Sequence, residues 1–412
     1  MNHSPSPSAP RYLPWLLGVL TAFGPFAIDM YLPAFAQITR DFAARPGMVQ
    51  LTLAAFLLSS GVSQVLYGLL SDRYGRRRPL LVGCALYALG SLGCALAPSL
   101  PLLVLGRVVQ ALGGAAGMVI ARAVVRDLFD ERGSARVFSE LMLVMGVAPI
   151  VAPTLGGQIL AFGSWRLIFC LLTAFGGFCF LATFFALPES LPQSRRSRES
   201  WLVSAKIFLA LLENRRFLGY CLVMGFCAGT MFAYISGSPF VYMDLYGVSV
   251  GHFGLFFGLN ALGLMASTQI NYLLLRKHTP EMILSWSTGS SLFLSVLLVV
   301  AGATGWGGLP ALAGILFFAL FCVGLSNPNL MAVAMAPFGR EAGRASAMLG
   351  AMPFAMGALA GAMVGVLHNG TALPMTATLA LCSAGAFVAL RTLGQRPGDE
   401  EPEADPITES ED

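Results

Sequence analysis

Long apolar runs recur throughout this chain, and only short polar breaks separate them. A helix needs about 20 apolar residues to cross a bilayer, and these runs reach that length without the strict alternation of barrel strands. Inside lipid, a helix also satisfies its own backbone hydrogen bonds. We therefore predict an all-α membrane protein with twelve transmembrane helices, at residues 12–36, 48–71, 79–97, 101–125, 137–161, 165–187, 216–243, 251–275, 282–303, 309–335, 344–367 and 371–393.

The composition agrees with a membrane location. Hydrophobic residues make up 56% of the chain and charged residues only 11%, whereas a soluble domain carries about 25% charged residues. All eight cysteines fall in apolar runs, as small buried hydrophobic residues would, so no disulfide or metal framework is indicated. The net charge of +4 combines basic breaks with an acidic tail and does not indicate a nucleic-acid partner.

The distribution of lysine and arginine predicts the orientation of the helices. Most of these residues lie in the breaks after the second, fourth, sixth, eighth and tenth runs. Breaks rich in positive charge stay on the cytoplasmic side of a membrane. We therefore expect a multi-pass protein of the bacterial inner membrane with both termini in the cytoplasm.

The longest break divides the twelve runs into two sets of six. It covers residues 188–215 and is basic, so we interpret it as a cytoplasmic linker between an N-terminal bundle at 12–187 and a C-terminal bundle at 216–393. Two pseudo-symmetric six-helix halves are the plan of alternating-access transporters. The ends, residues 1–11 and 394–412, are expected to be disordered because they contain few apolar residues.

The chain lacks the motifs of other energy sources and of enzymes. Neither Lys206 nor Lys277 is preceded by the glycines of a phosphate-binding loop, and the four histidines lie near span ends or in a tail. A membrane enzyme or a sensor is an alternative, but no nucleophile–base set and no extramembrane domain supports it. We expect a monomeric transporter without cofactor or metal, which uses an ion gradient and has protons, a small molecule and the lipid bilayer as its partners.

One acidic residue, Asp29, lies well inside a predicted span. A charged side chain at mid-membrane is costly, which makes such a residue a candidate functional site. Arg107 lies in the fourth span at a similar expected depth, about 9 Å from the outer surface. The two could form an ion pair. In one interpretation Asp29 binds a proton and releases it when substrate binds, with Arg107 tuning its affinity; in the other, the pair only fastens two helices together.

The break between the second and third runs reads GLLSDRYGRRRP, residues 68–79. Gly68 and Gly75 permit a close approach or a sharp turn, and Asp72 can cap a helix or pair with an arginine. The break resembles the signature G-x-x-x-D-R-x-G-R-R of the major facilitator superfamily. In that family the loop is a latch between the halves, so the resemblance implies conformational roles for Asp72, Arg73 and Arg76. The alternative is an ordinary basic loop with accidental glycines.

Two further motifs extend the resemblance. RVVQALGGAAG in the fourth span matches the family's R-x-x-Q-G-x-G at Arg107, Gln110 and Gly113, with Ala111 in place of glycine. APIVAPTLGG in the fifth span is similar to the exporters' G-x-x-x-G-P-x-x-G-G. It keeps Pro153, Gly156 and Gly157, but has Ala148 and Ala152 where glycine is usual. Proline and glycine predict a bend and a helix contact, and the resemblance implies export.

FGPFAIDMYLPAF at residues 23–35 and SGSPFVYMDLYGVS at 236–249 resemble the bicyclomycin- and chloramphenicol-resistance branch of drug:proton antiporters. This resemblance covers residues 13–393 and implies proton-coupled export of small amphipathic drug-like compounds. Uptake or exchange of a natural metabolite is the alternative. The family's pocket lies between the halves near the midplane, and the candidate substrate-binding residues there are Tyr31, Gln110, Tyr234, Ser236, Asn260, Asn327 and Asn329. Packing roles for the two tyrosines, and a helix irregularity at 327–329, remain open.

Overall fold

The protein is described from a computed structural model, which places residues 10, 12–196, 213–336 and 342–394. Twelve of its helices are long and apolar enough to cross a membrane, so the predicted all-α membrane fold is confirmed. The N-terminal helices are α1 (Leu13–Thr21), α2 (Phe23–Asp29), η1 (Leu32–Ala34), α3 (Phe35–Asp41), α4 (Pro46–Tyr74), α5 (Arg77–Ala95), α6 (Leu100–Leu128), α7 (Glu131–Phe162), α8 (Arg166–Ala186) and η2 (Gln193–Arg195). The C-terminal helices are α10 (Arg215–Pro239), η3 (Phe240–Leu245), α11 (Val250–Leu274), α12 (Pro280–Thr304), α13 (Gly308–Met335), α14 (Ala342–Val366) and α15 (Leu373–Leu393).

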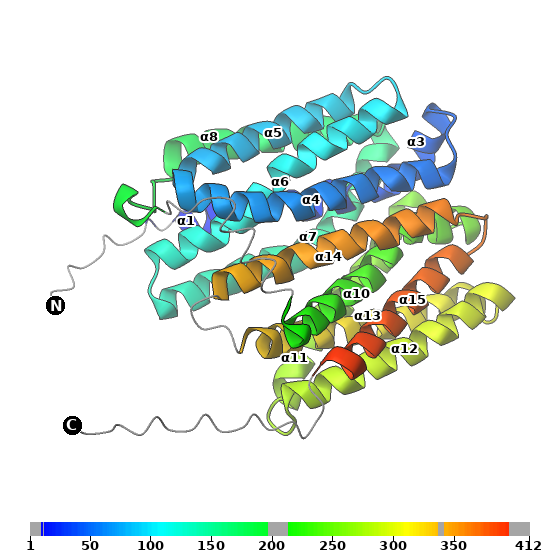
Figure 1. Ribbon diagram of the computed structural model, residues 1–412. Helices are drawn as coiled ribbons and strands as arrows, with labels where there is room; N and C mark the ends of the chain where they lie inside the picture. Colours follow the sequence, from blue (N-terminus) through cyan, green and yellow to red (C-terminus); the bar gives the residue numbers. More distant parts are fainter. Residues whose placement is uncertain (1–9, 11, 197–212, 337–341, 395–412) are drawn as a thin grey trace, which may run out of the picture.

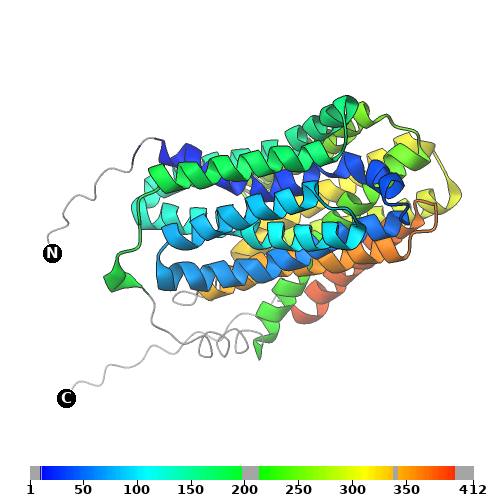
Figure 2. The ribbon, with the colours of Figure 1, turned by 90° about the horizontal axis from the view of Figure 1, so that it is seen from above.

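The helices form two bundles whose members run along one common direction (Figures 1 and 2). In the first bundle α5 packs against α6 and α8, and in the second α10 packs against α14 and α15. The bundles meet along two seams, where α4 crosses α14 and α7 crosses α11. The predicted two-bundle fold is therefore confirmed.

The ends of the chain and most of the linker lie outside the described residues. Both predicted disordered tails, 1–11 and 394–412, fall there apart from residues 10 and 394. Of the predicted linker at 188–215, residues 188–196 and 213–215 are described. Its first residues pack against the first bundle, since Ser190 and Leu191 are buried.

Helices α5 and α6 cross so closely that their contact excludes side chains. A Cβ atom at Gly113 of α6 would overlap backbone atoms of Gly83 and Tyr87 on α5. A Cβ at Gly106 would lie 2.7 Å from the sulfur of Cys94. Lipid offers no hydrophobic force between helices, so close packing of small residues has to hold them together. The glycines of the third and fourth runs therefore form this crossing.

The first span is a broken helix rather than the single run that the hydropathy predicts. It extends from Leu13 to Asp41 and is interrupted at Ala22 and again at residues 30–31. Pro33 has no N–H to offer the carbonyl of Asp29, four residues earlier, so a regular helix cannot continue through this point. Irregular backbone at membrane depth is tolerated where protein surrounds it, and residues 27–35 are all buried.

Candidate functional site

Asp29 is the last residue of α2, directly before the second break of the first span. Its side chain is buried, at 4% exposure, and the described residues include no hydrogen-bond or ion-pair partner for it. It lies near the middle of the span from Leu13 to Asp41, deeper than the sequence indicates, because this span continues beyond the predicted end at residue 36. Tyr234, on α10 of the opposite bundle, is within electrostatic range of the carboxyl group.

Arg107 lies beside this break and is fully buried. Its Nη1 donates to the carbonyl oxygen of Ala27, at 2.9 Å, and to Oε1 of Gln110, at 2.6 Å. Cation–π attraction can stabilise a buried guanidinium that lies within about 6 Å of an aromatic centroid. Three rings meet this condition, those of Phe56, Tyr31 and Phe169, at 4.2, 4.8 and 5.9 Å.

The ion pair suggested for Asp29 and Arg107 is absent among the described contacts. Arg107 is instead held by neutral groups, because Gln110, which accepts from it, is itself fixed by donating to Oγ of Ser91 at 2.8 Å. Within the part of the chain that the structure describes, the Nε and Nη2 atoms of Arg107 have no partner. These two donors form one edge of the guanidinium, which is the edge that binds a carboxylate through two parallel hydrogen bonds.

The predicted pocket residues fall into separate groups. In the first bundle, the amide of Gln110 accepts a hydrogen bond from Arg107 and donates one to Ser91. The hydroxyl of Tyr31 bonds to Thr52 in the same bundle. In the second bundle, Tyr234 accepts a hydrogen bond of 3.0 Å from Nδ2 of Asn260 and stacks on Phe257. Tyr234 and Asn260 therefore form one group in the second bundle, and Gln110 belongs to another in the first.

The remaining candidates lie elsewhere in the second bundle. Ser236 is buried and its hydroxyl donates to the carbonyl of Gly361 on α14 at 3.4 Å. Asn329 donates to Oδ1 of Asn271 at 2.6 Å, which joins α13 to α11, whereas Asn327 is exposed. No described contact joins these two asparagines of α13 to Asp29 or Arg107. Their proposed contact with substrate remains a prediction.

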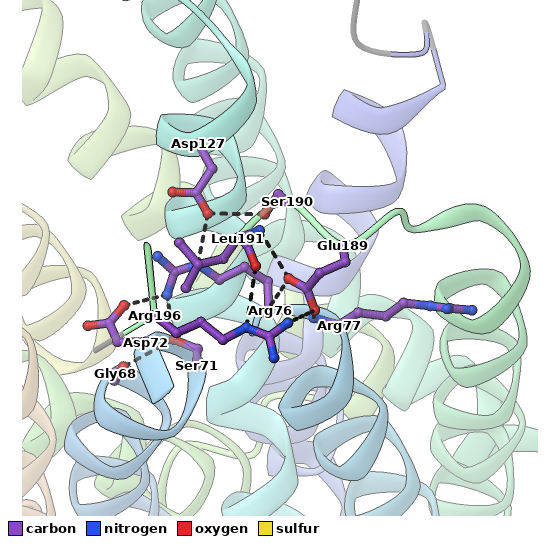
Figure 3. Close-up of polar contacts among 10 residues, drawn as sticks. All are labelled: Gly68, Ser71, Asp72, Arg76, Arg77, Asp127, Glu189, Ser190, Leu191 and Arg196. Atoms are coloured by element: carbon purple, nitrogen blue, oxygen red, sulfur yellow. Dashed lines mark hydrogen bonds and ion pairs between the residues drawn. The ribbon is translucent and has the colours of Figure 1, made fainter. Parts of the chain in front are cut away.

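The signature loop between α4 and α5 centres on Arg76 (Figure 3). Its Nε donates to Asp127 at the end of α6, at 2.8 Å, and its Nη1 donates to Asp72, at 2.5 Å, and to Ser71. Burial alone would lower the pKa of Arg76, but the hydrogen bonds and charges of Asp127 and Asp72 raise it above its ordinary value. Arg76 is therefore a permanent positive charge between two carboxylates.

Glu189, the second residue of the linker, binds the same loop (Figure 3). Its carboxylate accepts from the backbone N–H groups of Arg76, at 2.7 Å, and Arg77, at 3.3 Å, where α5 begins. An acid at this place satisfies unpaired N–H groups of the helix end. Gly75 has a φ of +89°, and a Cβ there would lie 2.7 Å from the Glu189 carboxyl carbon. The loop, α6 and the linker therefore form one unit.

Replacing Arg76 by alanine is expected to destabilise the protein. The change leaves Asp127 and Asp72 without their shared cation, and we expect it to lower the free energy of unfolding by about 2 kcal/mol. Breaking a fully buried ion pair costs more, but the Asp72 side chain is 55% exposed. The unfolding temperature of the purified protein measures the effect. Arg73→Ala is the control, since the one contact of the Arg73 side chain among the described residues is with the ring of Tyr74. Equal losses in both variants would refute the assignment.

The fifth-span motif forms a close contact with both bundles. Within α7, Gly156 lies against the backbone of Met30, the residue after Asp29, where a Cβ would come within 2.9 Å of the Met30 carbonyl carbon. A Cβ at the neighbouring Gly157 would lie 2.9 Å from the carbonyl oxygen of Val250 on α11. Pro153 and Pro149 both interrupt the hydrogen bonds of α7. The helix contact predicted for this motif is therefore present.

Comparisons with known proteins place these features in a family. The family model described as Major Facilitator Superfamily matches residues 17–362. The chain is 38% identical to an uncharacterized MFS-type transporter, YdgK, of Bacillus subtilis, over 92% of this chain and 94% of that one. It is 32% identical to a bicyclomycin resistance protein homolog of Haemophilus influenzae, over 92% and 95%, and 28% identical to the multidrug resistance protein MdtL of Klebsiella pneumoniae, over 79% and 81%.

Solved structures share the fold at low sequence identity. A bacterial homolog of the human lysosomal transporter Spinster aligns with a TM-score of 0.73 and 17% identity, covering 95% of this chain and all of that one. A D-xylose–proton symporter aligns with a TM-score of 0.69 and 15% identity, covering 93% and 97%. At these identities the likeness concerns the fold alone.

Proposed function

This chain belongs to the major facilitator superfamily and, within it, to the branch of the bicyclomycin-resistance proteins; from this we propose that it exports small amphipathic compounds in exchange for protons. Relatives named for bicyclomycin and multidrug resistance support export. The basic breaks support a bacterial inner-membrane location with cytoplasmic termini. The observation that carries the proposal is the buried carboxyl group of Asp29, which lies at a break in the first span and has no partner among the described residues.

Asp29 is suited to gain and lose a proton because neither of its states is locked by a neighbour. A charged carboxylate at this depth costs about 3 kcal/mol or more, and this cost favours the protonated group where no cation is paired with it. Arg107, which donates to the carbonyl of Ala27 two residues before Asp29, has no partner for Nε and Nη2 among the described residues. When the bundles move and Asp29 loses its proton, this edge receives the carboxylate. The two groups thus couple the charge of the site to conformation.

One proton supplies enough energy for export. A membrane potential of 100 mV gives about 2.3 kcal/mol for each charge that crosses, and this free energy corresponds to a concentration ratio of about fifty. A single titrating carboxylate such as Asp29 therefore suffices. No second acidic site is needed, and Glu140 is occupied in an exposed pair with Arg136.

The second bundle supplies the side chains that fit an amphipathic cargo. Tyr234 and Phe257 present two stacked rings, and Asn260 adds an amide whose Oδ1 has no partner. These three groups are uncharged. A neutral or weakly polar aromatic compound can stack on the rings and donate a hydrogen bond to the amide, whereas a highly charged metabolite lacks counter-charges. This chemistry supports drug-like cargo over charged metabolites.

The proposal is tested by transport in proteoliposomes. Chloramphenicol and bicyclomycin are the probes, and a pH gradient of either direction is imposed across the vesicle membrane. Antiport predicts that the probe accumulates on the more acidic side and that a protonophore abolishes the accumulation. Protein-free vesicles give the passive background. Accumulation on the alkaline side would indicate symport, and accumulation that survives the protonophore would exclude proton coupling.

A further inference from the structure

The second bundle carries a group of exposed cations at one of its ends. Its members, which we call the basic patch, are Arg215, Arg216, Arg276, Lys277 and Arg391. They come from the start of α10, from the turn between α11 and α12, and from the last turn of α15. Because successive spans run in opposite directions, these three places lie at the same end of the bundle. The fold therefore assembles the patch from distant parts of the chain.

Direct contacts join the end of α15 to the α11–α12 turn. Nη2 of Arg391 donates to Oγ of Ser285, at 3.1 Å, where α15 and α12 run side by side (Figure 1). Trp286, the next residue, packs edge to face against His278, with ring centroids 4.9 Å apart. His278 follows Lys277 directly. Cations that are more than a hundred residues apart in sequence therefore belong to one surface.

The start of α10 lies beside the end of α15. A Cβ at Gly219 of α10 would lie 2.6 Å from the side chain of Leu393. The first turn of α10, which contains Arg215 and Arg216, directly precedes Gly219, and both arginines are exposed. These two cations therefore extend the patch past the end of α15.

The charges of the basic patch are not neutralised by neighbouring acids. None of its members forms an ion pair with an acid in the part of the chain that the structure describes. The described acids nearest to them in sequence, Glu213 and Glu281, are exposed. The corresponding turn of the first bundle, between α4 and α5, differs because Arg76 there binds Asp72 and Asp127. The patch is therefore able to bind an anion from elsewhere.

Aromatic rings orient two of the arginines of the patch. Arg276 lies over the ring of Tyr272 and Arg391 lies over the ring of Phe387, each at 5.2 Å from the centroid. A ring beneath a guanidinium attracts it without using its N–H donors. Those donors are what binds a carboxylate through strong, charge-assisted hydrogen bonds. Carboxylates are thus a suitable ligand for this surface.

The chain itself contains a matching anion. Residues 399–412, which we call the acidic tail, contain eight acidic residues and no lysine or arginine. The first of these acids, Asp399, comes five residues after Gly394, and a chain of that length reaches at most about 17 Å. A segment attached by so short a connection is present at a high effective concentration. Acidic tails of this composition commonly act as interaction segments.

We propose that the acidic tail binds the basic patch. An anionic lipid headgroup is the other anion that reaches this surface, but the tail is attached directly beside Arg391. Its carboxylates stabilise the approach of α10, α15 and the α11–α12 turn, and they shield the patch from lipid headgroups. The contact depends neither on cargo nor on protons, so it holds whether or not the proposed transport function is correct.

Carbodiimide cross-linking tests the contact, because it joins a carboxylate to an amine only where the two touch. The chain has two lysines, and Lys206→Arg leaves Lys277 as the single one. This protein is cross-linked in phosphatidylcholine nanodiscs, and the bonded peptides of the monomer are identified by mass spectrometry. We expect a bond between Lys277 and the acidic tail. Its yield should fall about fivefold between about 0.1 M and about 1 M salt, since the screening length falls from about 10 Å to about 3 Å.

Charge variants show whether the patch is responsible. Arg276→Gln and Arg391→Gln should each lower the yield about threefold, as expected for the loss of one exposed ion pair. Arg45→Gln is the matched control, because Arg45 is an exposed cation in the connection between α3 and α4, outside the patch; it should cross-link at the parent level. If Arg391→Gln, which also loses the bond to Ser285, does not fold, Arg276→Gln decides.

Three results would overturn the proposal. The first is the absence of a bond between Lys277 and the acidic tail at low salt. The second is an equal yield in the patch variants and in the Arg45→Gln control. The third is a bond that disappears when the nanodiscs contain an equal share of phosphatidylglycerol, because this would assign the patch to anionic lipid headgroups.

Discussion

Asp29→Asn is expected to abolish the release of protons that follows substrate binding, while the protein stays folded and still binds substrate. Asparagine has nearly the shape of aspartic acid but cannot give up a proton. Since Asp29 is buried and forms no ion pair with any residue that the structure describes, replacing it by a neutral amide removes no described ion pair. A pH indicator in weakly buffered detergent solution measures the release when chloramphenicol is added to the purified protein.

The matched control is Asp130→Asn. Asp130 caps α7 by accepting a hydrogen bond of 2.8 Å from the N–H of Gly133, and asparagine caps a helix about as well as aspartate. This variant changes the same functional group outside the proposed site and should release protons normally. Release at the parent level from the Asp29→Asn variant would remove Asp29 from the coupling mechanism, whatever its effect on transport.

Gly113→Ala is expected to have the largest effect on folding. The added Cβ would overlap backbone atoms of Gly83 and Tyr87 on α5, so α5 and α6 have to move apart. Overpacking of this kind costs about 1–3 kcal/mol, and here no flexible side chain is available to give way. We expect an unfolding temperature lower by several degrees and a reduced yield of monodisperse protein.

Gly177→Ala on α8 is the corresponding control. Its Cβ would meet nothing within 4 Å, and alanine is the better helix former by about 1 kcal/mol. This variant should therefore be as stable as the parent or slightly more stable. A similar fall in unfolding temperature in both variants would mean that the loss does not come from the α5–α6 crossing.

The fold could be predicted from the sequence because lipid imposes simple rules. Inside hydrocarbon the backbone N–H and C=O groups must bond to one another, and few structures other than helices allow this. The hydropathy of the sequence therefore locates all twelve spans. Hydropathy does not reveal the break after Asp29, because residues 30–32 are as apolar as the rest of the span. The position of Pro33, four residues after Asp29, was the local signal for it.

The site was only partly predictable. Asp29 and Arg107 could be chosen as candidates from the sequence, because charged residues are rare inside apolar runs. Their separation in the present conformation could not be foreseen, since it depends on Gln110 and Ser91 holding the guanidinium. Partners distant in sequence, such as Glu189 beside Arg76, give no spacing pattern. Even the cysteines contain an exception, because Cys170 is exposed whereas the other seven are buried.

The contacts of α7 have a mechanical consequence. Gly156 rests on the backbone of Met30, and Gly157 rests on the backbone of Val250. No side chain lies between these surfaces to absorb a displacement, and packed protein interiors compress little. A small shift of the turn that follows Asp29 is therefore expected to displace the Gly156–Gly157 segment of α7 against α11. If Asp29 takes up and releases a proton as proposed, this contact is the direct route by which a movement at that carboxyl group reaches the second bundle.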